Sequence, residues 1–134
     1  PGMYLNLNSG YIFSQFLKSS YENKPFVING NKDSVRSFLD IDDATNFFIS
    51  LINSDVSNEI LNVGSSEAVS LLNLAKKFNA ALNKNNQIIF NDLCEKTFLI
   101  PDIKKTQKLL NWHQKVGLDE SINKIFKFYT DKNL

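Results

Sequence analysis

The sequence contains very few residues of the kinds that bind metals or form disulfides. Of its 134 residues, only Cys94 is a cysteine and only His113 is a histidine. A single cysteine cannot form an internal disulfide, which is typical of proteins from a reducing cytoplasm. A transition-metal site needs several clustered His and Cys ligands. We therefore expect no metal site, and we interpret His113 as a solvent-exposed loop residue.

Long apolar runs and clustered positive charge are also missing. The longest apolar run is only a few residues, far below the roughly 20 that a membrane-spanning helix requires, and residues 1–4 do not resemble a signal peptide. The formal net charge is +1, and the lysines are spread along the chain. Nucleic-acid binding needs clustered positive charge. We therefore expect a cytoplasmic protein with neither a membrane nor a nucleic acid as its partner.

No motif for self-sufficient catalysis is present. The sequence has no Gly-x-x-x-x-Gly-Lys-Ser/Thr phosphate loop, no Gly-x-Gly-x-x-Gly run after a strand and no Gly-x-Ser-x-Gly elbow. Asp40, Asp42 and Asp43 form an acidic cluster at the start of an expected helix, where carboxylates cap free N–H groups. We interpret this cluster as a helix cap, and we predict no catalytic residue within the chain.

Arginine is nearly absent as well. Of the 15 lysine and arginine residues, only Arg36 is an arginine. Its planar guanidinium group can bind phosphate or carboxylate with two parallel hydrogen bonds, which lysine cannot do. One arginine in a lysine-rich chain therefore indicates a specific role such as phosphate binding. An ordinary surface or structural ion pair is the alternative, and composition alone favours it.

The hydrophobic pattern predicts a single α/β domain over residues 1–134. Apolar residues recur at the 3.6-residue spacing of amphipathic helices, and short extended runs lie between these segments. The strands are too few and too short for a complete doubly wound sheet, so the expected fold is a mixed small sheet with about five helices. The predicted helices are 11–22, 43–52 after the cap Asp42, 71–82 after the cap Ser70, 102–110, and one that begins at 118 or 119. The predicted strands are 26–29, 35–39, 59–64 and 87–90.

Seven short motifs follow one another along nearly the whole chain. They are Pro1-Gly2-Met3, Pro25-Phe26-Val27-Ile28-Asn29-Gly30, Arg36-Ser37-Phe38-Leu39-Asp40-Ile41-Asp42-Asp43, Leu61-Asn62-Val63-Gly64, Pro101-Asp102-Ile103-Lys104-Lys105, Leu110-Asn111-Trp112 and Leu118-Asp119-Glu120-Ser121-Ile122. Together they resemble, in the same order, the C-terminal portion of the extended short-chain dehydrogenases/reductases that modify nucleotide sugars. Each motif alone is weak, but the whole ordered series is hard to obtain by chance.

The resemblance implies both a fold and a parent enzyme. The chain would be the C-terminal substrate-binding lobe of a Rossmann-type NAD-dependent epimerase/dehydratase, with a UDP-sugar or dTDP-sugar as substrate. NAD and the Tyr-x-x-x-Lys catalytic pair would belong to an N-terminal Rossmann domain that the chain lacks, so we expect the chain alone to be inactive. The full-length enzyme would be a cytoplasmic homodimer, and residues 3–10 look like members from lipopolysaccharide gene clusters. Epimerisation, dehydration and decarboxylation all stay open.

The resemblance also implies which residues bind the substrate. Arg36 would contact the pyrophosphate, Asn62 would donate to it from the end of a strand, and the strand from Val27 to Asn29 would line the base. Asn29 stands where the family usually has an aromatic residue, and the segment 91–95 lacks the family's second phosphate arginine. These departures keep an alternative open, a degenerate or truncated binding module without catalysis. An unrelated α/β binding domain is the remaining alternative.

Overall fold

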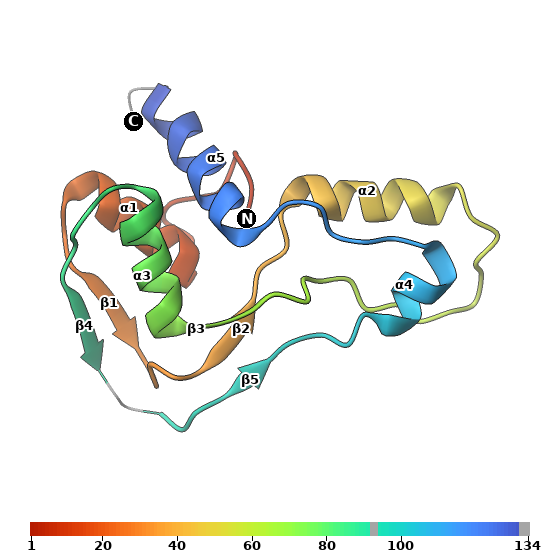
Figure 1. Ribbon diagram of the computed structural model, residues 1–134, viewed down its shortest axis with the longest axis horizontal. Coiled ribbons are helices and arrows are strands. Elements are labelled where there is room, and N and C mark those ends of the chain that lie inside the picture. Colours follow the sequence, from red (N-terminus) through yellow and green to blue (C-terminus); the bar gives the residue numbers. More distant parts are fainter. Residues whose placement is uncertain (92–93, 132–134) are drawn as a thin grey trace.

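Five helices and five short strands are interspersed along the chain in the computed structural model, which describes residues 1–91 and 94–131 (Figure 1). The predicted mixed α/β architecture with about five helices is confirmed. The helices are α1 (Ile12–Glu22), α2 (Ile41–Ile52), α3 (Leu71–Ala81), α4 (Lys104–Leu110) and α5 (Leu118–Asp131). The strands are β1 (Phe26–Asn29), β2 (Val35–Ser37), β3 (Ala68–Ser70), β4 (Ile88–Asn91) and β5 (Phe98–Leu99).

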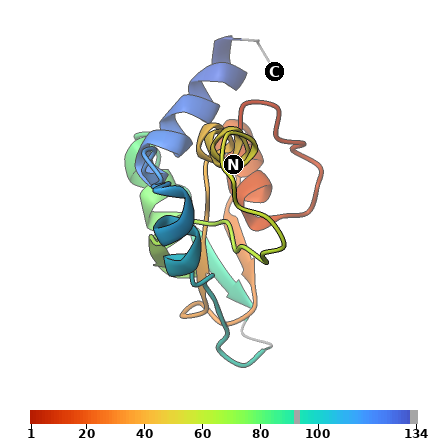
Figure 2. The same ribbon diagram turned by 90° about the vertical axis from the view of Figure 1, so that its right-hand side faces the viewer.

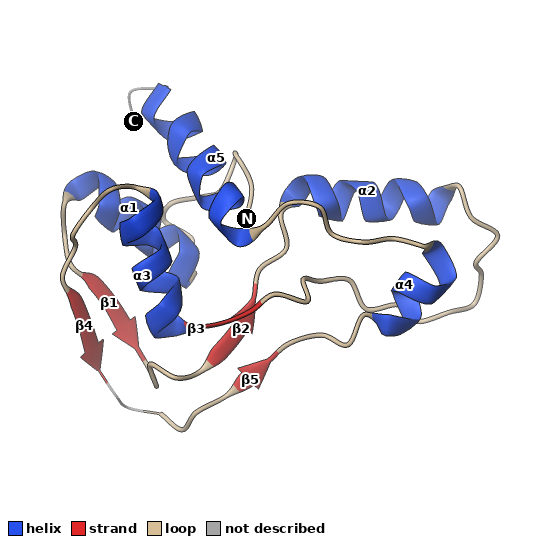
Figure 3. Ribbon diagram, viewed as in Figure 1, coloured by secondary structure: helices blue, strands red, loops and turns tan. Residues whose placement is uncertain are grey.

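The strands form two small sheets rather than one (Figure 3). β1 and β4 pair in parallel, with Phe26 opposite Ile88. In the second sheet β2 lies in the centre, antiparallel to β3 and parallel to β5. β3 and β5 were not among the predicted strands, because runs of three and two residues are too short to show an alternating pattern. The second sheet matters most for the site, since its central strand contains Arg36.

The main hydrophobic core lies between α1, α3, α5 and β1. Figure 1 shows the three helices grouped at one end of the molecule, beside the β1–β4 sheet. Phe16 of α1, Phe26 of β1 and Phe78 of α3 are completely buried, and the rings of Phe16 and Phe26 stack with centroids 4.7 Å apart. Burial of a large apolar side chain contributes about 1.5–3 kcal/mol. These aromatic contacts therefore fix how α1 and α3 pack against β1.

A second, smaller core joins α2 to α4 and to the segment that follows α4. Phe47, Ile103 and Trp112 form it, and the rings of Phe47 and Trp112 meet edge to face with centroids 5.7 Å apart. The indole Nε1 of Trp112 donates to the backbone carbonyl of Asp43 over 3.2 Å. Figure 1 shows α2 and α4 extending away from the main core, and Figure 2 shows the same arm from its end, with α2 viewed along its axis. The chain thus builds a main lobe and an arm.

The acidic cluster at the start of α2 is structural, as predicted, but its capping residue is Asp40 and not Asp42. The carboxylate of Asp40 accepts from the backbone N–H of Asp42 over 2.9 Å, and α2 begins at Ile41, two residues earlier than predicted. Asp40 also accepts from the side chains of Ser121 and Lys124 in α5, at 2.6 and 3.0 Å. The cap and these two bonds together fix the start of α2 to α5.

The predicted strand 59–64 is a loop in the structure, and side chains of α4 hold it. Lys105 donates to the carbonyl of Ile60 over 3.1 Å, and Thr106 donates to the carbonyl of Asn62 over 2.6 Å. The prediction was wrong because an extended segment can satisfy its backbone groups with side chains as well as with a neighbouring strand. Asn62 therefore lies at α4 rather than at the end of a strand.

Candidate functional site

Arg36 lies in the middle of β2, opposite Val69 of β3 and Leu99 of β5. Its Nη1 donates to the carbonyl oxygens of Val35 and Thr97, at 2.8 and 3.3 Å. Its Nη2 donates to the hydroxyl of Thr97 at 2.9 Å. Because all of these partners are uncharged, they fix the position of the guanidinium group without neutralising its charge.

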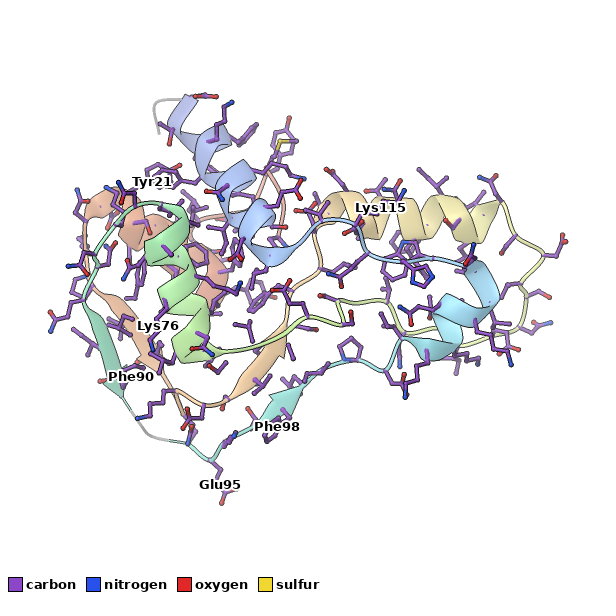
Figure 4. All side chains as sticks on the ribbon, in the orientation of Figure 1. Tyr21, Lys76, Phe90, Glu95, Phe98 and Lys115 are labelled. Carbon is purple, nitrogen blue, oxygen red and sulfur yellow. The ribbon has the colours of Figure 1, made fainter. Side chains whose placement is uncertain are left out.

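No carboxylate within residues 1–91 and 94–131 pairs with Arg36, and every ion pair found there uses a lysine. Glu95, two residues before Thr97, points away from the sheet (Figure 4). The segment 91–95, in which no second arginine occurs, includes residues 92 and 93, which lie outside the described residues. The alternative role of Arg36 in an ordinary ion pair therefore has no support in the described part of the chain.

Arg36 lines a hollow of about 340 Å³ between α1 and β2. Tyr11, which directly precedes α1 and is 73% exposed, and Phe38, which directly follows β2, line it as well. Ligand pockets typically measure about 300–1,000 Å³ and combine apolar surface with a few polar groups. The hollow has this character, because Arg36 is the one charged side chain among its lining residues. The others are Pro1, Leu5, Ile12, Phe13 and Ser37.

A larger hollow of about 530 Å³ adjoins the first, since Pro1 and Leu5 line both. Its one charged side chain, Asp42, is already paired with Lys124 at 2.6 Å. A phosphate-bearing ligand needs an available positive charge, so the smaller hollow, which Arg36 lines, is the candidate site. The larger hollow adds volume beside it for the remainder of a ligand.

Asn62 does not line the Arg36 hollow, because the loop that contains it is held by α4. Its side-chain Nδ2 donates to the backbone carbonyl of Asp102 over 3.0 Å, and its own carbonyl accepts from Thr106. The structure therefore does not bring Asn62 and Arg36 together at one hollow. Contact of Asn62 with a pyrophosphate stays a prediction.

Val27 and Asn29 lie on the exposed face of the β1–β4 sheet, because the alternation along β1 buries Phe26 and Ile28 instead. Asn91 of β4 donates its side-chain amide to Asn29 over 2.8 Å. Neither Val27 nor Asn29 lines the hollow that contains Arg36. Their predicted position along a nucleotide base stays a prediction, and the structure assigns them to a separate surface of the main lobe.

The sequence did not indicate Thr97, which contacts the guanidinium group, or Ser34, which supports Thr97. Thr97 lies 61 residues after Arg36, and the parallel pairing of β2 with the two-residue strand β5 brings it there. Ser34 accepts from the backbone N–H of Thr97 over 3.0 Å. No sequence pattern indicates these contacts, since neither residue belongs to one of the seven motifs.

The buried carboxylate of Asp40, at the start of α2, has a shifted pKa. Burial would raise the pKa of Asp40, but hydrogen bonds from Ser121, the α2 backbone and Lys124 outweigh it and hold that pKa below its ordinary value. Perturbed pKa values are typical of catalytic sites. The lowered pKa of Asp40 has a structural cause instead, because the groups that lower it are the ones that fix the start of α2 to α5.

Neither a metal cluster nor a membrane helix occurs in the described residues. No group of three or more His, Cys, Asp and Glu side chains in this part of the chain is arranged to hold a metal ion. None of its helices combines the length and the apolar character needed to cross a bilayer.

Comparison with known proteins gives matches across nearly the whole chain. UDP-glucuronic acid decarboxylase 1 of Danio rerio is 26% identical over 134 residues, which covers 96% of this chain and 31% of the relative. The dTDP-4-dehydro-6-deoxyglucose reductase of Escherichia coli is 31% identical over 114 residues, which covers 84% of this chain and 36% of the relative. The chain thus spans about a third of the length of the curated relatives it matches. No family model matches the sequence.

The fold occurs in solved structures of similar proteins. UDP-glucuronic acid 4-epimerase of Bacillus cereus, in complex with UDP-glucuronic acid and NAD, has a TM-score of 0.81 at 21% identity. The match covers 92% of this chain and 40% of that one. The main lobe and the arm together therefore have the fold of the C-terminal portion of Rossmann-type epimerases, as the motifs predict.

Proposed function

The chain belongs to the extended short-chain dehydrogenases/reductases, and from this premise we propose that it forms the nucleotide-sugar-binding part of an NAD-dependent enzyme. The substrate in this proposal is a UDP-sugar or a dTDP-sugar, and the reaction is an epimerisation, a dehydration or a decarboxylation. The names of similar proteins support this range, since UDP-glucuronic acid decarboxylase, UDP-glucuronic acid 4-epimerase and dTDP-glucose 4,6-dehydratase are among them. The dTDP-4-dehydro-6-deoxyglucose reductase also supports a dTDP-sugar as the alternative substrate. This chain binds and orients the substrate, while NAD, when bound, supplies the hydride chemistry.

The observation that best supports the proposal is the unneutralised charge of Arg36 beside an apolar hollow. A diphosphate presents pairs of oxygens to which a planar guanidinium group donates two parallel hydrogen bonds. The rings of Tyr11 and Phe38 provide apolar surface for the flat or carbon-rich part of the same ligand. Fixing the diphosphate in this way positions the sugar for reaction, and such positioning lowers the barrier without any chemistry by the chain itself.

The NAD-binding partner belongs to the same proposal. Four large apolar side chains of α2 are exposed, Ile41 at 48%, Phe48 at 55%, Ile49 at 50% and Ile52 at 80%. Apolar surface gathered on one helix is typical of an interaction site. We propose that a Rossmann-type NAD-binding domain covers this face, in a cytoplasmic enzyme that forms homodimers. The partial coverage of the relatives supports this idea, because a match over 31–36% of their length leaves room for such a domain.

One observation favours a second function, that of a binding module without catalysis. Asn29 is bonded to Asn91, and the other exposed side chain of β1, Val27, is aliphatic. This face of β1 therefore offers no aromatic ring on which a base could stack. A module of this kind would bind nucleotides weakly or not at all, and it would need no cofactor domain.

Calorimetric titration of the chain with UDP, dTDP and GDP tests the proposal. We expect UDP or dTDP to bind. Arg36→Ala should weaken that binding by about ten- to a hundredfold, because hydrogen bonds to charged groups contribute about 1.5–3 kcal/mol. Arg36→Lys keeps the charge but loses the planar fork, so we expect an affinity between the two.

Lys32→Ala is the matched control, because it removes one positive charge from the exposed turn before β2 without touching the hollow. We expect it to change the affinity by less than about twofold, as for most exposed charges. Binding of UDP by Arg36→Ala with the affinity of the unmodified chain would contradict the assignment of Arg36. Absence of binding with all three nucleotides would favour the module without catalysis.

A further inference from the structure

Ser34 and Thr97 form a series of hydrogen bonds that ends on the guanidinium group of Arg36. Ser34 is only 3% exposed, and its own carbonyl accepts from the backbone N–H of Leu71, the first residue of α3. Its hydroxyl oxygen accepts from the backbone N–H of Thr97 over 3.0 Å, and the two hydroxyl oxygens are 3.3 Å apart. Thr97 accepts from Arg36 through its hydroxyl and its carbonyl. A buried residue therefore fixes Thr97, and Thr97 fixes Arg36.

These contacts occupy some of the donors of Arg36 and leave two adjacent ones. A guanidinium group has five N–H donors. Nη1 donates to two carbonyl oxygens, those of Val35 and Thr97, and Nη2 donates once, to the hydroxyl of Thr97. The N–H of Nε and the second N–H of Nη2 have no partner among residues 1–91 and 94–131. Because Nη1 and Nη2 both donate to Thr97, these bonds use the edge between the two amino groups. The remaining N–H groups of Nε and Nη2 then share the other edge, where two parallel donors match two oxygens of a phosphate.

From this geometry we propose that Thr97, anchored by Ser34, is a positioning residue that orients Arg36 for binding of one phosphate group through Nε and Nη2. The inference rests on the proposed nucleotide site and adds to it the edge of the guanidinium group that the ligand uses. Thr97 does not line the hollow, so it acts through Arg36 rather than by touching the ligand. A side chain that is already held in its binding conformation loses less freedom when the ligand arrives.

The chemistry of the partners distinguishes this role from simple stabilisation. A carboxylate would hold a guanidinium group more strongly than a hydroxyl and a carbonyl do, because the hydrogen bonds would be charge-assisted. It would also cancel the positive charge. Thr97 offers two neutral acceptors instead, at 2.9 and 3.3 Å, and therefore immobilises Arg36 while leaving its charge available to an anion.

A double-mutant cycle on Arg36 and Thr97 tests the inference, with calorimetric titration of inorganic pyrophosphate and of UDP. We expect Thr97→Val, which keeps the shape but removes the hydroxyl, to weaken both ligands about fivefold, in the range of one lost hydrogen bond. Thr97→Ser restores the hydroxyl and should restore the affinity. Thr45→Val is the matched control, because the hydroxyl of Thr45 is also exposed and bonds only to the carbonyl of Ile41 in its own helix.

The cycle separates positioning from a structural role. If Thr97 acts through Arg36, then Thr97→Val has no further effect on pyrophosphate binding in the Arg36→Ala background. An equal loss in both backgrounds, or no loss in either, would overturn the inference while leaving the nucleotide site in place. If Arg36→Ala alone binds both pyrophosphate and UDP with the affinity of the unmodified chain, the proposed function is overturned, and this inference with it. If Thr97→Val alters the circular dichroism spectrum, Thr97→Ala takes its place in the cycle, and the same outcomes support or overturn the inference.

Discussion

The carboxylate of Asp43 joins the start of α2 to the segment before α5. It is 1% exposed, and its two oxygens accept from the backbone N–H groups of Lys115 and Val116, at 3.0 and 2.9 Å. Asp43→Asn keeps the size and shape of the side chain but replaces one of these oxygens with an NH2 group. Whichever way the amide is turned, one backbone N–H then faces a second donor.

The expected cost follows from this mismatch. The variant loses one charge-assisted hydrogen bond and leaves one backbone donor without an acceptor, and together these should lower the free energy of unfolding by about 2–4 kcal/mol. Asp42→Asn is the matched comparison, since the side chain of Asp42 is 57% exposed and makes one ion pair, with Lys124. Exposed pairs contribute at most about 1 kcal/mol. Both variants remove one negative charge from the first turn of α2, so the helix dipole affects them alike.

Urea unfolding followed by far-UV circular dichroism distinguishes the two variants. For a slope of about 1–3 kcal/mol per molar urea, we expect the midpoint of Asp43→Asn to fall by about 1–2 M with an unchanged slope. The midpoint of Asp42→Asn should fall by less than about 0.5 M. Equal midpoints for the two variants would show that the Asp43 contacts do not hold the segment at residues 115–116, and the reasoning would be refuted.

Two further predictions concern stability. Hydrogen bonds hold the pKa of Asp40 below its ordinary value, so the stability that this carboxylate contributes is present above the unfolded pKa of about 3.9 and is lost as the pH falls through the folded pKa. The difference in urea midpoint between the unmodified chain and Asp40→Asn should therefore narrow between pH 6 and pH 3. A difference that stays constant over this range would contradict the prediction. In Gly64→Ala the new Cβ would lie 2.3 Å from Cγ of Pro101, a ring that cannot turn away, so we expect a loss of about 1–3 kcal/mol in thermal unfolding. Gly117→Ala, where a Cβ meets nothing within 4 Å, is the control; because it directly precedes α5, where alanine caps less well than glycine, we expect a loss of less than about 1 kcal/mol.

The longer helices could be predicted from the sequence because each one buries a single face, α1, α3 and α5 against the main core and α2 against the second core. Of the four residues of α5 that the pattern predicts to face inward, Ile122, Ile125 and Tyr129 are buried and Phe126 is partly buried. The second sheet could not be predicted, because pairing across two- and three-residue strands depends on contacts between distant segments and not on a local pattern. The loop 59–64 shows the opposite error, since its local pattern is that of a strand while side chains of α4 satisfy its backbone.

The candidate site, like the fold, could be predicted from the sequence only in part. Arg36 could be singled out because an isolated arginine among lysines is visible in the composition, but its phosphate role was implied by the family resemblance and not by composition. The hydrogen bonds of Thr97 and Ser34 could not, since they depend on the register between β2 and β5. Asn62 shows how a motif can indicate a residue without indicating its contacts, because its amide donates to the carbonyl of Asp102.

The geometry of the Arg36 hollow depends on residues that take no part in binding. One side of the hollow belongs to α1, which is fixed in the main core through Phe16. The other side ends at Phe38, two residues before Asp40. Asp40 is bonded to Ser121 in α5, a helix that the same core also holds. Both sides of the hollow are therefore tied to one core, the first by packing and the second by a buried carboxylate. The acidic cluster, which the sequence indicated only as a helix cap, thus also ties one side of the hollow to the main core through α5.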